Sequence, residues 1–208
     1  MGAKFAWFVL IFIFTAFIMN NSVDPLEQKS PAPNPLRAAL RSSVAEPHQL
    51  LDQIPLMQRY ASGATSAEEY MAVTRTMLSF WAGYAPATHH LPKTYRGFFE
   101  SYLDALQLDV GACPPVTQVE AVEELAFYYV LLGSGMGAKV ILRNNCGNDF
   151  SKSNLYHLAQ NSTPLWKDFN HSYLPEVSFI GADRVMKDSR RMFDTLLSKI
   201  QKITWETL

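Results

Sequence analysis

The stretch YYVLLGSGMGAKVI, residues 128–141, decides how the rest of the chain is interpreted. Gly133, Gly135 and Gly137 stand at alternate positions within an otherwise apolar segment of helical length. A glycine in a helix interior destabilises the helix by about 1 kcal/mol relative to alanine. From these residues alone, tight packing against a neighbouring helix is the simplest reason for three glycines in a core helix.

The chain has helical periodicity from Asn34 onward. Asn34 is a suitable N-cap for a helix whose first residue is Pro35, where the missing N–H of proline is harmless. Pro47 is expected to bend this helix or to break it into two. Its apolar stripe consists of Leu36, Leu40, Val44, His48 and Leu51. His48 therefore faces the core, where a histidine is more often a hydrogen-bonded residue than a ligand.

Further helices follow the same spacing. Ser66 and Glu69 form a capping box, and the helix that they start ends before Pro86. Three more helices are predicted at 95–108, 119–142 and 177–203, and a loop at 111–115. The buried face of the last helix is predicted to consist of Ala182, Val185, Ser189, Phe193, Leu196 and Ile200. Because no segment alternates like a strand, the sequence predicts an all-α, single-domain multi-helix bundle over residues 36–203, with a tail at 204–208.

Composition limits the classes of function. The 208 residues are 48% apolar, enough for one globular core, and the formal charge of −1 argues against nucleic acid as a partner. Cys113 and Cys146 fit no zinc or redox spacing; two free thiols are the simplest interpretation, with a disulfide as the alternative. His89 and His90 are interpreted as loop or surface residues.

The first 19 residues differ from the rest of the chain. Phe5–Met19 is a run of fifteen residues without a charge, whereas a membrane span needs about twenty. Three interpretations are open: an uncleaved anchor tethering a cytoplasmic body to the inner membrane, a signal peptide, or a start assigned too early, with Met19 as the true first residue. The polar, proline-rich residues 20–35 are predicted to be a linker.

Two segments carry a resemblance to a known family. The first, LRSSVAEPHQLLD, resembles the N-terminal part of bacterial heme oxygenases of the biliverdin-producing type. Leu40, Arg41, Val44, His48, Leu51 and Asp52 fall on the positions of the family pattern without a gap, although Val44 stands where the family has threonine. The second, FYYVLLGSGMGAKVI, is similar to the glycine-containing segment of that family. Downstream, PLWKDF and RRMFDTLL are similar to its closing segments, so that the likeness runs from about Pro35 to Gln201.

The resemblance implies a function for each matching residue. His48 would bind the heme iron on the proximal side, and the glycine segment would be the distal helix, with Gly135 among the residues that contact heme and with Gly133, Ser134 and Gly137 in the catalytic part. Glycine there would let the backbone approach the porphyrin and leave room for dioxygen. The cations expected to bind the propionates are Arg41, Lys187, Arg190 and Arg191, of which Lys187 and Arg191 share a helix face.

The family oxidises heme with O2 to biliverdin, iron and CO, and the resemblance implies the same here. The electrons would come from an external ferredoxin or reductase, and a bilin acceptor such as a bacterial phytochrome would be a partner for the product. Four departures bear on turnover more than on heme binding: Val44, Pro47, Leu132 and Ala138. Leu132 replaces a glutamate that belongs to a buried polar network.

Two other functions are open. One is a non-catalytic heme carrier or sensor with the same fold. The other is a protein of the same fold that does not bind heme, as in the thiaminase-like relatives. Those proteins rely on acidic and cysteine side chains within the bundle, and the absence of such a set from this sequence argues against this alternative.

Overall fold

The chain divides into two units, Met1–Pro33 and Asn34–Leu208. The computed structural model describes residues 35–85, 92–111, 116, 119–144, 153–174 and 181–206, all within the second unit. The hydrophobic segment at 1–19 and nearly all of the linker lie outside the described residues. The described elements are α2 (Pro35–Asp52), α3 (Pro55–Ser62), α4 (Ala67–Tyr84), α5 (Lys93–Val110), α6 (Glu124–Asn144), α7 (Asn154–Asp168), the π-helix η2 (Phe169–Tyr173) and α8 (Ala182–Glu206). None of these is a strand, which confirms the all-α prediction.

Helix α2 begins at Pro35 as predicted but is not broken at Pro47. It continues to Asp52, and Pro47 is buried within it. A proline inside a helix destabilises it by about 3 kcal/mol. The apolar stripe of α2 is buried on both sides of the proline, at Val44 and Leu51, and this burial holds the last turn in place. His48 therefore belongs to the same rigid element as Arg41.

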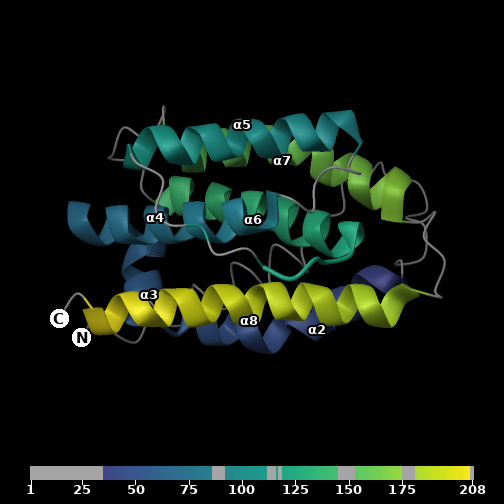
Figure 1. The fold of residues 1–208 in the computed structure, drawn as a ribbon, viewed down its shortest axis with the longest axis horizontal. Helices are drawn as coiled ribbons and strands as arrows, with labels where there is room; N and C mark the ends of the chain where they lie inside the picture. Colours follow the sequence, from purple (N-terminus) through teal and green to yellow (C-terminus); the bar gives the residue numbers. More distant parts are fainter. Residues whose placement is uncertain are drawn as a thin grey trace, which may run out of the picture. The chain divides into compact units, whose positions relative to one another are not determined.

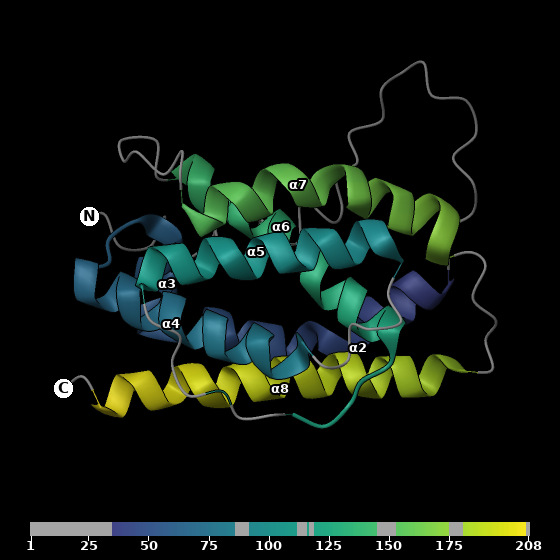
Figure 2. The same cartoon turned by 45° about the horizontal axis from the view of Figure 1, so that its top comes forward.

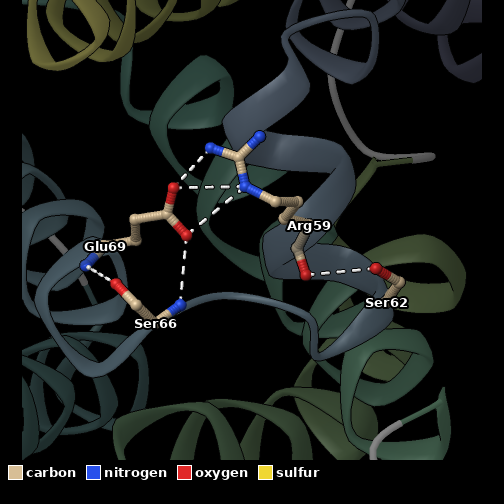
Figure 3. Close-up of polar contacts among 4 residues, drawn as sticks. All are labelled: Arg59, Ser62, Ser66 and Glu69. Carbon is tan, nitrogen blue, oxygen red and sulfur yellow. Dashed lines mark hydrogen bonds and ion pairs between the residues drawn. The ribbon is translucent and has the colours of Figure 1, made fainter. Parts of the chain in front are cut away.

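The turn between α3 and α4 contains the predicted capping box, shown in Figure 3. Glu69 N–H donates to Ser66 Oγ at 3.1 Å, and Ser66 N–H donates to Glu69 Oε2 at 3.1 Å. Arg59 from α3 binds the same carboxylate through Nε, at 3.1 Å to Oε1. This hydrogen bond is the main reason why the pKa of Glu69 is lowered. Gly63 ends α3 with a φ of 74°, a conformation that favours glycine.

The helices pack in layers that Figures 1 and 2 show from two directions. Helices α2 and α8 lie side by side, α6 packs against α7 and α8, and α4 packs against α5 and α8. The centre is aromatic: the Phe127 ring of α6 contacts Phe99 of α5 edge-on at 4.9 Å and Trp81 of α4 at 5.9 Å between centroids. These rings are almost fully buried. Helix α6 is therefore fixed at the centre of the described bundle.

Helix α6 starts later than predicted, at Glu124 instead of near Val119. The preceding segment is extended along α4 and α8, with the Val119 N–H donating to the Gly83 carbonyl oxygen at 3.4 Å. By length and composition alone, α6 is long and apolar enough to cross a membrane. The core helix of a soluble protein can meet the same two conditions, and half of the most apolar 18 residues of α6 are buried within the bundle.

The last helix, α8, has the buried face that was predicted from the sequence. Phe193 is half-buried, and the other predicted positions are buried: Ala182, Val185, Ser189, Leu196 and Ile200. The helix extends to Glu206, three residues beyond its predicted end. The part of its predicted range before residue 181 lies outside the described residues.

Candidate functional site

His48 lies on α2, where it contacts both its own helix and α8. Its Nδ1 lies 3.0 Å from Asp52 Oδ2, one helical turn later, and its ring centroid lies 5.6 Å from that of Phe193. Its side chain is 20% exposed. With a carboxylate at Nδ1, the neutral ring carries its proton there and its lone pair on Nε2. A carboxylate behind the second ring nitrogen is the usual support of a histidine that binds a metal.

Two arginines share the face of α2 that carries His48. Arg37, Arg41 and His48 are spaced by four and seven residues, which places them along one side of a helix. Arg41 is half-buried and Arg37 is exposed. The face thus presents an imidazole at one end and two guanidinium groups at the other.

The structure divides the three glycines of α6 between two faces. A Cβ atom added at Gly135 would lie 1.9 Å from Ser162 Oγ and 2.3 Å from Ser162 Cβ, so α7 fills the space beside it. A Cβ atom added at Gly133 or Gly137 would meet no atom of the described residues within 4 Å. Close helix packing therefore accounts for Gly135, whereas the face shared by Gly133 and Gly137, four residues apart, is open.

Tyr129 connects the open face of α6 with the cationic face of α2. It precedes Gly133 by four residues and so lies on the same side of the helix. Burial raises the pKa of Tyr129 to about 12, while the nearby charges of Arg37 and Arg41 act in the opposite direction. Its ring lies 5.9 Å from that of Trp166 on α7. Because the Arg37 guanidinium lies 6.0 Å from the centroid of the same Trp166 ring, side chains of α2 and α6 meet at this indole.

No functional role was predicted for Arg37, Tyr129 or Trp166, although the last two belong to the segments that carry the family resemblance. The Arg37 guanidinium lies over the Trp166 ring, 6.0 Å from its centroid. The available signal was spacing: Arg37 lies four residues before Arg41, and Tyr129 four residues before Gly133. Trp166 carried no such signal, because it comes from a helix that the sequence analysis did not assign.

Ser134 and two of the three predicted propionate cations of α8 have partners within the protein. The Ser134 hydroxyl donates to the Val130 carbonyl oxygen at 2.8 Å. Arg190 pairs with Glu46 of α2 at 2.6 Å, two residues from His48. Arg191 instead binds Glu120 and Asp188 and lies beside the segment that leads into α6. Lys187 is exposed. Of these cations, the contacts bring only Arg190 close to His48.

The departures from the family pattern are apolar and buried. Leu132 is completely buried on α6, and Val44 is 6% exposed on α2. Ala138 is also buried. Leu132 is therefore part of the hydrophobic core.

Other titratable residues form no second centre within the described part of the chain. There, no group of three His, Cys, Asp or Glu side chains is arranged to hold a metal ion. His157 contacts the side chain of Asn161 one turn later, and partial burial lowers its pKa. His171 Nδ1 lies 2.7 Å from the Lys167 carbonyl oxygen. The cysteines and the His89–His90 pair lie outside the described residues.

Comparisons with protein-family models, with curated proteins and with solved structures found no match for this chain. The assignment of a function therefore depends on the geometry of the α2 and α6 faces and on the family resemblance of the sequence.

Proposed function

We propose that this protein binds heme between the His48 face of α2 and the Gly133–Gly137 face of α6, and oxidises it with O2 to biliverdin, iron and CO. The electrons come from an external ferredoxin or reductase. His48 Nε2 is the ligand of the iron, and Arg37 and Arg41 bind the heme carboxylates. Heme is the substrate and supplies the iron that activates O2.

The observation that carries the proposal is that Arg37 of α2 and Tyr129 of α6 both lie beside the Trp166 ring, at 6.0 Å and 5.9 Å from its centroid. These contacts bring together two helices that the family likeness assigns to opposite sides of a porphyrin. The open space beside Gly133 and Gly137 also fits a flat ligand. A carboxylate 3.0 Å from His48 Nδ1 fits an imidazole that ligates through Nε2, since it fixes the orientation of the ring.

A second candidate function, a heme carrier or sensor, is favoured by one observation. Leu132 is buried and apolar where the family has a glutamate, and a buried leucine neither accepts nor relays a proton. The side chains of α2 suffice to bind heme, but the oxidation also needs protons delivered on the α6 side. Heme binding and heme opening are therefore tested separately.

The binding test is a hemin titration of the full chain, followed by its Soret band and its EPR spectrum. We expect wild type to show a histidine-ligated iron and His48→Ala to lose that signature, with recovery on addition of free imidazole. His171→Ala, an exposed histidine on η2, is the matched control and should resemble wild type. Retention of the wild-type spectrum by His48→Ala would contradict the assignment of the ligand.

The turnover test uses the loaded protein with a ferredoxin–reductase system and O2. Loss of the Soret band together with the appearance of biliverdin absorbance supports heme opening. A Soret band that persists through many reductant additions supports the carrier or sensor. In that case Leu132→Glu is the informative variant, because it restores the acidic group of the family pattern.

A further inference from the structure

The segment that enters α6 is bound by one face of α8. Arg184, Asp188 and Arg191 are spaced by four and three residues and so form one stripe along that helix. The Glu123 N–H donates to Asp188 Oδ2 at 2.8 Å, and Arg184 Nε lies 2.7 Å from the carboxylate of Glu123. The stripe therefore contacts the backbone and the side chain of the residue that precedes α6.

Arg191 binds the same segment two residues earlier. Its Nη2 donates to the Ala121 carbonyl oxygen at 2.6 Å and to Asp188 Oδ1 at 3.0 Å, while Nη1 pairs with Glu120. The Asp188 side chain is only 8% exposed. A nearly buried carboxylate thus satisfies a backbone N–H at the start of α6 and is itself held by Arg191. We call this arrangement of Asp188 and Arg191 the α6 clamp.

The clamp matters because the open face of α6 lacks side chains that could fix its position. A Cβ atom added at Gly133 or Gly137 would meet no atom of the described residues there. The apolar side of α6 packs in the core, Gly135 presses against Ser162, and Glu123, the residue before the first turn, is hydrogen-bonded to Asp188. The contact at Glu123 holds one end of the helix, so Asp188 contributes to the height at which the glycines lie.

We infer that Asp188 and Arg191 are positioning residues that set the height of the α6 glycines over the bound heme. This inference rests on the proposed function. It gives Arg191 a different role from that of a cation for the propionates, and it predicts that Asp188, which cannot bind a propionate, has the same effect as Arg191. The two side chains act through one another, so their substitutions should not be additive.

The first experiment needs no heme. Amide hydrogen exchange is measured on the full apo chain for wild type, Asp188→Asn and the matched control Asp183→Asn, an exposed aspartate of the same helix. We expect the amides of the first turn of α6 to exchange about tenfold faster in Asp188→Asn and to be unchanged in Asp183→Asn. Equal exchange in the two variants would overturn the clamp, whether or not the protein binds heme.

The second experiment measures hemin dissociation and the EPR spin state in Asp188→Asn, Arg191→Gln and the double variant. Arg96→Gln of α5 is a control for the loss of a half-buried arginine near a carboxylate. We expect about tenfold faster dissociation and a changed spin state in both single variants and no further change in the double variant. Hemin dimethyl ester, which has no free carboxylates, should show the same pattern. Faster hemin dissociation in Arg191→Gln but not in Asp188→Asn, together with no such effect for the dimethyl ester, would overturn the inference. Arg191 would then be a cation that binds a propionate.

The outcomes of the two experiments separate the inference from the proposed function. If wild type does not bind hemin and Asp188→Asn nevertheless alters the exchange, the proposed function is refuted. The clamp then only stabilises the start of α6. Normal hemin binding with no change in exchange or spin state would refute the clamp alone.

Discussion

Helix α6 has two faces that contain the same residue type for different physical reasons. On one face Gly135 is pressed against Ser162 of α7, where no side chain fits. On the other, Gly133 and Gly137 adjoin open space that a methyl group would not fill. The three glycines of this motif therefore do not share one structural reason. Packing explains the first face, and the second face has no packing reason to be glycine.

The energetics of the two faces differ accordingly. At Gly135 the helix gives up about 1 kcal/mol of intrinsic propensity and gains a close contact between two helices. At Gly133 and Gly137 the same loss is incurred twice without a contact in return. An unfilled face that is kept open at such a cost is what a binding surface requires.

The largest expected effect is on the packed face. Gly135→Ala should destabilise the protein by about 2 kcal/mol, because the new Cβ atom overlaps Ser162 and forces α6 and α7 apart. The measurement is the free energy of unfolding in urea. Ser162→Gly should restore most of the loss in the double variant, since it removes the two nearest atoms. A Gly135→Ala protein as stable as wild type would remove the distinction between the faces.

An intermediate effect is expected at Tyr129 and depends on pH. Burial raises the pKa of Tyr129 to about 12, so between pH 10 and 12 the unfolded chain ionises this phenol while the folded chain does not. The unfolding free energy is unaffected below pH 10 and falls as the pH rises through this range, by about 1 kcal/mol at pH 11. Tyr129→Phe should lose less stability than wild type between pH 9 and 11. Identical pH profiles would indicate that the ring is not held in the buried site.

The smallest effect on stability, and opposite in sign, is expected on the open face. Gly133→Ala and Gly137→Ala should each stabilise the apo protein by about 0.5–1 kcal/mol, because alanine favours the helix and meets no neighbour. The same variants should weaken hemin binding, since a methyl group enters the space assigned to the ligand. Unfolding and hemin titration on the same samples check both signs. A gain in stability with unchanged hemin affinity would separate this face from the ligand.

Most of the fold follows from local signals in the sequence. The capping box of Ser66 and Glu69, the proline at the start of α2 and the buried stripe of α8 each depend on neighbouring residues, and each is present as predicted. The predicted start of α6 was wrong. The helix begins at Glu124, and the preceding Glu123 N–H donates to Asp188, which lies 65 residues later in the chain. No spacing rule connects two such distant positions. Helix α7, with Pro164 inside it, was not assigned as an element.

The sequence identified several residues of the candidate site but did not show which of them lie on the same face. His48 was placed on the buried stripe of α2 from periodicity, and the structure adds its contact with Asp52. The sequence treated the three glycines as one group, and only the position of α7 separates Gly135 from the other two. No role was predicted for Tyr129, because the charges that act on it are those of Arg37 and Arg41 on another helix.

The place of Trp166 has a practical consequence. This indole contacts both the Arg37 guanidinium and the Tyr129 ring, whereas the indole of Trp81 is buried in the aromatic centre of the bundle. A heme bound beside Tyr129, as proposed, would accept excitation energy from Trp166. Quenching of its emission would then follow hemin addition without any attached dye.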